Sequence, residues 1–205
     1  TVIRGKRRLF SEWVLHRTVY EQRPEVGAVF HSHAPYATAF GATQTVLPHP
    51  FLPEAVVSLG PTIPSVRRTM PGQAAASALA EVLDDCQSCL LEGNGLLSWG
   101  VDAEQAYLRM ELVEHLCRIA KESVPLGGVK LLESSMIERL TKKHVSAGLG
   151  APNLCAKSTE KEQRLLSTKV ANRLTKKPTH VESSVLNEVV AEVTKLTLSE
   201  LRGEK

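Results

Sequence analysis

Short apolar stretches alternate with longer amphipathic ones along the first part of the chain, up to about residue 150. The short stretches are rich in Val, Leu and Ile and are bounded by Gly, Pro or Asn, which is typical of strands between turns. The longer ones place apolar side chains three and four positions apart, as an amphipathic helix does. The pattern predicts strands at 26–33, 56–59, 63–68, 89–92 and 96–99, a helix that begins after the N-cap Ser11, and helices at 34–42, 73–83, 102–122 and 134–147.

The pattern changes after residue 150. A linker at 151–154 precedes two helical stretches, and the last of them carries an apolar stripe within residues 183–201. We therefore divide the chain into a domain at 1–150 and a helical C-terminal extension at 151–205. The stripe favours either docking onto a partner or packing back onto the chain's own domain, and the residues leave both open.

Composition and charge exclude two classes of partner. Hydrophobic residues make up 42% of the chain and charged residues 23%, which is ordinary for a soluble globular protein. The net charge of +3 is small, and no long basic run is interleaved with aromatic residues, so we expect no nucleic-acid partner. No apolar run approaches the ~20 residues that span a bilayer, and no signal peptide is visible, so we expect no membrane contact and a cytoplasmic location.

Four cysteines are present, and Cys86 and Cys89 have the C-x-x-C spacing of redox and zinc motifs. A redox pair should lie at a strand-to-helix turn, whereas Cys89 runs directly into a predicted strand. No second C-x-x-C completes a structural zinc site. We interpret Cys86 and Cys89 as ordinary thiols in a reducing compartment.

The predicted strand at 26–33 ends in His31 and His33. Side chains two positions apart on a strand point to the same face, so the two imidazoles project together and Ser32 faces away. Two such imidazoles form half of a site for a divalent metal, most naturally zinc. The alternative, a pair of structural histidines, is equally open on this motif alone.

Further motifs surround the two histidines at fixed spacings, and with them the chain resembles the class II aldolase/adducin family. The resemblance covers about residues 1–140, and it implies an α/β fold of three layers, α/β/α, with a mixed, largely antiparallel central sheet. It also implies that the N-terminal part of the family domain, which holds the substrate phosphate, is missing from this sequence. The matching motifs are Ser11-Glu12, His16 to Tyr20, Arg23-Pro24-Glu25-Val26, His31-Ser32-His33, residues 52–60 and residues 90–100.

The resemblance also implies roles for individual residues. Glu12 matches the family's proton-transfer glutamate, and His31 and His33 match two of its metal-binding histidines. The third metal histidine of the family falls at Asn94, inside the turn Gly93-Asn94-Gly95. A neutral amide oxygen is a much poorer zinc ligand than an imidazole, so we expect Zn²⁺ to be bound weakly or not at all.

Two functions follow from the resemblance. The first is a metal-dependent lyase that cleaves a ketose 1-phosphate of the L-fuculose or L-rhamnulose type into an aldehyde and dihydroxyacetone phosphate through a zinc-stabilised enediolate. The second is an adducin-like assembly protein that keeps the fold without a competent metal site. The resemblance further implies a homotetramer in the cytoplasm. Some aldolases of this kind are cargo of bacterial microcompartments, so the C-terminal helix could bind a microcompartment shell.

Overall fold

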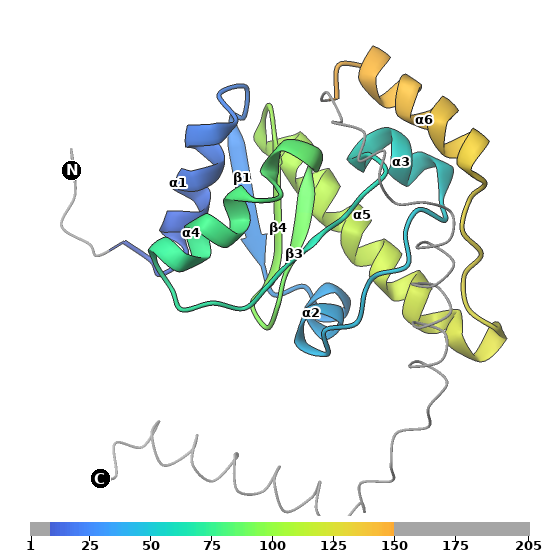
Figure 1. Ribbon diagram of the computed structural model, residues 1–205, viewed down its shortest axis with the longest axis horizontal. Coiled ribbons are helices and arrows are strands. Elements are labelled where there is room, and N and C mark those ends of the chain that lie inside the picture. Colours follow the sequence, from blue (N-terminus) through green and yellow to red (C-terminus); the bar gives the residue numbers. More distant parts are fainter. Residues whose placement is uncertain (1–8, 150–205) are drawn as a thin grey trace, which may run out of the picture. The chain divides into compact units, whose positions relative to one another are not determined.

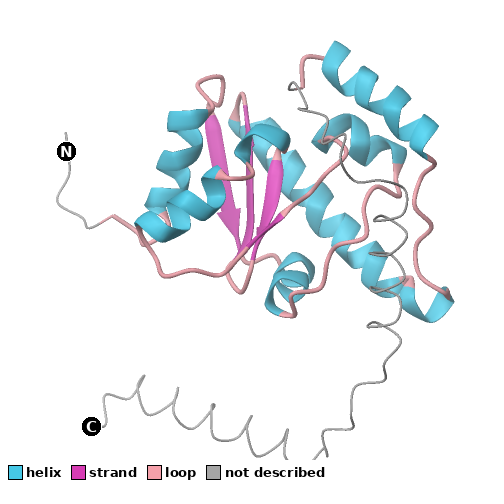
Figure 2. Ribbon diagram, viewed as in Figure 1, coloured by secondary structure: helices cyan, strands magenta, loops and turns pink. Residues whose placement is uncertain are grey.

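The computed structural model describes residues 9–149. They form an α/β fold in which helices lie on both sides of a central sheet (Figures 1 and 2). The predicted C-terminal extension at 151–205 lies outside the described residues. The elements are α1 (Trp13–Gln22), β1 (Ala28–Ser32), α2 (Pro35–Ala42), α3 (Pro53–Leu59), β2 (Ser65–Val66), α4 (Gln73–Ala80), β3 (Ser88–Leu91), β4 (Gly95–Gly100), α5 (Ala103–Glu122) and α6 (Ser134–Ser146), with single 3₁₀ turns at Leu83–Asp85 and Val124–Leu126.

Within these residues the strands lie in the order β1–β4–β3–β2. The β1–β4 and β4–β3 pairs are antiparallel and the β3–β2 pair is parallel, so the sheet is mixed and largely antiparallel, as predicted. His31 pairs with Leu97 and Ser32 with Leu96. The end of β1 therefore lies beside the beginning of β4 and the turn that precedes it.

Alternate residues of the sheet enter two separate hydrophobic cores, because successive side chains of a strand point to opposite faces. Cys89, Leu97 and Trp99 pack with α1 and α4 on one face. Leu90 and Leu96 pack with α2, α3 and α5 on the other. All four residues of β3 and all six residues of β4 are buried. The predicted three layers are therefore present, with β3 and β4 covered on both sides.

Three sequence predictions about local structure are wrong. Residues 56–59 belong to helix α3 and not to a strand, because Pro53 begins a helix whose Ala55, Val56 and Leu59 face the core. The predicted strand at 63–68 shortens to Ser65–Val66. Ser11 is not the N-cap of α1, since Glu12 occupies that position and the Ser11 hydroxyl donates to the Glu12 carboxylate instead.

One buried cation joins the helical layers to the sheet. The Arg109 guanidinium of α5 is only 4% exposed and donates to the Trp99 carbonyl at 2.8 Å, the Gln87 side-chain oxygen at 3.1 Å and the Leu149 carbonyl at 3.0 Å. Burial lowers the pKa of Arg109 to about 10, so it remains charged at neutral pH. Among the described residues no helix is both long and apolar enough to cross a membrane.

His49 lies in a loop between Pro48 and Pro50, and its ring nitrogens are turned into the protein. Its Nε2 lies 3.1 Å from the Gly60 carbonyl at the C-terminal end of α3, so Nε2 carries the proton. Its Nδ1 is buried and has no hydrogen-bond partner within residues 9–149. Protonation would place a second N–H at this enclosed atom, and burial lowers the pKa of His49 to about 4.

We predict that His49 makes the protein less stable in mild acid. Its folded pKa of about 4 lies below the ordinary value of 6.5, so the unfolded chain takes up the proton first and stability falls as the pH drops from 6.5 towards 4. Between about pH 7 and about pH 5, His49 should cost up to about 2 kcal/mol of unfolding free energy. His49→Gln should flatten the pH dependence of urea unfolding, whereas substitution of the exposed His115 to Gln should not. If the unfolding free energies of His49→Gln and wild type changed with pH by the same amount, the prediction would be contradicted.

Candidate functional site

His31 and His33 lie together at the end of β1, as their spacing predicts. The centroids of the two rings are 5.3 Å apart, and the ring planes are inclined by 78°. His31 follows Val29 on the face of β1 that packs against α1, since Val29 belongs to the core on that side. The imidazoles thus face the helix that carries Glu12 at its N-cap.

The turn between β3 and β4 brings Asn94 to both histidines. His31 Nε2 lies 2.7 Å from the Asn94 backbone oxygen, and His33 Nε2 lies 3.2 Å from the Asn94 side-chain oxygen. This approach needs a glycine at Gly95, which has φ +83° and where a Cβ would stand 2.2 Å from the Ser32 carbonyl oxygen. Asn94 itself lies outside the positive-φ region.

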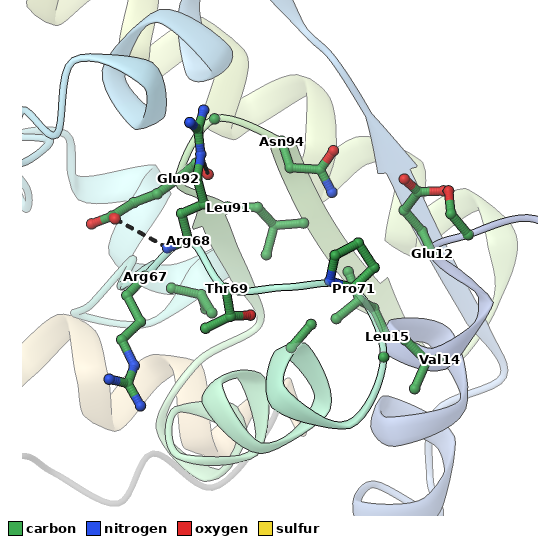
Figure 3. A pocket seen from close by; sticks show the side chains of 15 residues that line it. Glu12, Val14, Leu15, Arg67, Arg68, Thr69, Pro71, Leu91, Glu92 and Asn94 are labelled. Atoms are coloured by element: carbon green, nitrogen blue, oxygen red, sulfur yellow. Dashed lines mark hydrogen bonds between the residues drawn. The ribbon is translucent and has the colours of Figure 1, made fainter.

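Glu12 and Asn94 line the same pocket, a cavity of about 320 Å³ between α1, β3 and the segment that follows β2 (Figure 3). The pKa of the Glu12 carboxyl is lowered, chiefly by the hydrogen bond from the Ser11 hydroxyl and further by the nearby His31 and His33. The carboxylate is therefore ionised at neutral pH. A carboxylate base, two imidazoles and an amide oxygen meet at one end of the sheet.

His16, which begins one of the motifs shared with the family, is also close to this site. It lies one turn after Glu12 on α1 and is half-buried, with its ring edge-on to Phe10 at a centroid distance of 5.2 Å. Burial lowers the pKa of His16, the charge of His31 lowers it further, and Glu12 opposes both. The pKa of His16 thus depends on both Glu12 and His31, although His16 makes no hydrogen bond to either within the described residues.

The donor atoms fit a divalent metal in part. Ligands of a tetrahedral zinc at 2.0–2.1 Å lie about 3.3 Å from one another, and His33 Nε2 and the Asn94 side-chain oxygen are 3.2 Å apart. His31 Nε2 instead makes a hydrogen bond to the Asn94 backbone, which it would exchange for the metal. Residues 9–149 contain no group of three or more His, Cys, Asp or Glu side chains placed to hold a metal. The set of two imidazoles and one amide therefore fits a weak site.

Glu114 of α5 has a structural role that the sequence pattern does not indicate. The Glu114 carboxylate accepts hydrogen bonds from the backbone N–H groups of Tyr36 at 2.9 Å and Ala37 at 2.8 Å. The first turn of a helix leaves its N–H groups without partners inside the helix, and those of Tyr36 and Ala37 are two such groups of α2. Pro35, at the first helical position, has no N–H. Glu114 thus caps the helix that begins two residues after His33. No local pattern marks this contact, because the partners are 77 and 78 positions apart.

The three cysteines within the described residues take no part in the site. Cys86, Cys89 and Cys117 are buried and form no disulfide in the described part of the chain. Burial raises the pKa values of the Cys89 and Cys117 thiols, which keeps both protonated and unreactive. The interpretation of Cys86 and Cys89 as ordinary buried thiols agrees with this geometry.

The family described as Class II Aldolase and Adducin N-terminal domain matches residues 1–121. The chain belongs to this family. Class II aldolase relatives include the 5-deoxy-D-ribulose 1-phosphate aldolase of Bacillus thuringiensis serovar kurstaki, which is 28% identical over 148 residues, 72% of this chain and 68% of the relative. The 5-methylthioribulose-1-phosphate/5-deoxyribulose-1-phosphate aldolase of Rhodospirillum rubrum is 29% identical over 147 residues, 71% of this chain and 66% of the relative.

Solved class II aldolase structures share the fold. A putative aldolase/epimerase/decarboxylase from Escherichia coli superposes with a TM-score of 0.59 at 26% identity, over 67% of this chain and 68% of the other. An L-fuculose 1-phosphate aldolase superposes with a TM-score of 0.63 at 23% identity, over 69% and 66%. The chain spans about two thirds of the length of these relatives. Family and fold are therefore established for this class II aldolase relative.

We predict that Glu114 is needed to hold α2 in place. Glu114→Gln leaves one acceptor oxygen and turns an amide towards a backbone N–H, so it should lower the unfolding free energy by about 1–2 kcal/mol. Glu104→Gln, an exposed change on the same helix, should alter stability by less than about 0.5 kcal/mol. Chemical denaturation of the three proteins measures both effects, and equal stability of the two variants would contradict the capping role.

Proposed function

We propose that this chain is a class II aldolase-type lyase that cleaves a carbon–carbon bond of a phosphorylated ketose. The observation that carries the proposal is the convergence of Glu12, His31 and His33 on one end of the sheet, in a chain of this family. Two of the related proteins named above are a 5-deoxy-D-ribulose 1-phosphate aldolase and an L-fuculose 1-phosphate aldolase. A ketose 1-phosphate that yields an aldehyde and dihydroxyacetone phosphate is the substrate class we propose.

His31 and His33 are the residues that would hold a divalent metal, with the side-chain oxygen of Asn94 beside them. A zinc ion bound there supplies Lewis-acid polarisation of the substrate carbonyl. Glu12 acts as the base and acid that transfers the proton of the substrate. Its lowered pKa keeps the carboxylate available to accept the proton of the substrate hydroxyl as the carbon–carbon bond breaks. The same carboxyl group can then return that proton to the carbon that retained the bonding electrons.

The proposal predicts that His31 and His33 hold the metal and support turnover. The double variant His31→Ala/His33→Ala should lose zinc on dialysis, and cleavage of L-fuculose, L-rhamnulose or 5-deoxyribulose 1-phosphate should fall to background. Metal analysis by mass spectrometry and a coupled assay for dihydroxyacetone phosphate measure the two effects separately. His115→Ala, at an exposed histidine on α5, is the matched control. Unchanged zinc content in the double variant would exclude these ligands.

A second prediction concerns the amide at position 94. Asn94→His adds a third imidazole at a backbone position that needs no positive φ, so zinc affinity should rise by at least about tenfold. Asn94→Ala should not raise it. Competition with a fluorescent zinc chelator measures the three affinities. If Asn94→His binds zinc no better than the parent, the turn does not occupy the position of the third ligand.

The Asn94 amide also favours a second candidate function, an adducin-like assembly protein. The two imidazoles already satisfy their Nε2 atoms with Asn94 oxygens, so the site is stable as a hydrogen-bonded cluster. If the purified protein contains no metal and shows no turnover when zinc is added in excess, the result supports the assembly function. About one zinc per subunit together with zinc-dependent cleavage would select the lyase.

The oligomeric state, the cellular location and a partner of the C-terminal segment are also part of the proposal. We expect a homotetramer in the cytoplasm, as the family resemblance implies. A microcompartment shell stays a predicted partner of the C-terminal helix, and that helix lies outside the described residues.

A further inference from the structure

Asn94 is followed by Gly95, and this is the one Asn-Gly pair of the sequence. An asparagine side chain can lose ammonia when the backbone nitrogen of the next residue attacks its Cγ atom and closes a five-membered succinimide ring. A side chain on that next residue hinders the attack, so a glycine favours the reaction most. Asparagine is accordingly among the thermolabile residues of proteins. The other three asparagines of the chain precede Leu154, Arg173 and Glu188.

The fold requires the glycine at position 95. Gly95 has φ +83°, and a Cβ there would stand 2.2 Å from the Ser32 carbonyl oxygen and 2.9 Å from His33 Cδ2. A larger residue, which would slow succinimide formation, is therefore excluded by the close approach of the β3–β4 turn to β1. The same approach that brings Asn94 to the histidines thus keeps an unhindered backbone nitrogen next to its side chain.

The Asn94 amide also makes a polarising contact. Its side-chain oxygen lies 3.2 Å from His33 Nε2. An amide oxygen can only accept, so the imidazole donates this hydrogen bond. Negative charge develops on that oxygen when the Gly95 nitrogen adds to Cγ, and a donor already in place stabilises it. Asn94 is partly exposed and lines the pocket, so water can reach the succinimide once it has formed (Figure 3).

We propose that Asn94 is a site of spontaneous deamidation, assisted by His33, which converts the amide beside the two histidines into a carboxylate. The Gly95 nitrogen forms a bond to Cγ, and the bond from Cγ to Nδ2 breaks. The proton of the Gly95 nitrogen leaves with Nδ2 as ammonia. Water then adds to the succinimide and opens the ring. The net change consumes one water, releases one ammonia and leaves aspartate or isoaspartate at position 94, without an oxidant or a reductant.

The aspartate product changes what this end of the sheet can bind. Its carboxylate replaces the amide oxygen that lies 3.2 Å from His33 Nε2, next to the backbone oxygen that contacts His31. A carboxylate oxygen is an ordinary zinc ligand, whereas a neutral amide is a poor one. Deamidation should therefore strengthen the metal site as the protein ages. This consequence rests on the proposed function, whereas the modification itself does not.

The test follows the full chain during incubation at neutral pH and physiological temperature. Mass spectrometry of peptides, made with pepsin in acid to avoid conversion during handling, detects the exchange of NH₂ for OH. Asn94 should be converted at least about tenfold faster than the other three asparagines. His33→Ala should slow the conversion by at least about threefold, whereas His115→Ala should not. Asn94→Gln, whose longer side chain cannot close a five-membered ring, should show no conversion at that position.

Asn94→Asp reproduces the aspartate product without incubation and tests the consequence for the metal. Competition with a fluorescent zinc chelator should give this variant a Kd for Zn²⁺ at least about tenfold below that of freshly purified wild type. Asn94→Gln, which keeps a neutral amide, should bind zinc no better than wild type.

The outcomes separate the parts of the inference. Conversion at position 94 that is no faster than at the other asparagines would overturn the modification, and an unchanged rate in His33→Ala would overturn the assistance. Equal zinc affinity of Asn94→Asp and wild type would overturn the consequence for the metal. Thermal melts check that the variants fold, and His33→Gln, whose amide can still donate, should show an intermediate rate and gives the answer if His33→Ala melts early. Because conversion is read without metal or substrate, its failure is distinguishable from failure of the lyase assay.

Discussion

The close approach of the β3–β4 turn to the end of β1 is the constraint on which the site depends. Antiparallel pairing sets Ser32 opposite Leu96, so the residues just before β4 must pass beside His33. Gly95 makes this passage feasible, since a side chain there would collide with the Ser32 carbonyl. The backbone oxygen of Asn94 then reaches His31 and its side chain reaches His33. Strand register and one glycine therefore bring Asn94 to the two histidines, which lie 63 and 61 positions earlier in the sequence.

The helices hold this arrangement from both sides of the sheet. On one face, α1 presents Glu12 to the histidines, and its Leu15 and Val19 are buried against the strands. On the other face, α5 contributes Glu114, whose carboxylate fixes the start of α2 just beyond His33. The chain on either side of the H-x-H motif is thus restrained, by the sheet before it and by a capped helix after it. Such restraint from surrounding elements is what a site needs if its side chains are to keep one geometry.

The sequence predicted the parts of this molecule that depend on local periodicity. Helices α2, α5 and α6 and the β3–β4 hairpin follow directly from apolar spacing and glycine placement. The prediction was wrong at 56–59, where Val56 and Val57 suggest a strand but Pro53 starts a helix and the tertiary core favours it. No local pattern marks the contact of His49 with Gly60 or those of Glu114 with α2, since the partners lie 11, 77 and 78 positions away. In the site itself, strand alternation brings His31 and His33 together, whereas the contact of Asn94 with both histidines depends on the pairing of β1 with β4.

Asn94 lets the same geometry exist with or without a cation. Two imidazoles that faced a third histidine would need a metal or other hydrogen-bond partners for their ring nitrogens. An amide and its backbone carbonyl offer oxygens instead, and both Nε2 atoms reach one within 3.2 Å. Both Nε2 atoms therefore have a hydrogen-bond partner without any metal. A metal bound there would have to displace the contact between His31 and the Asn94 backbone.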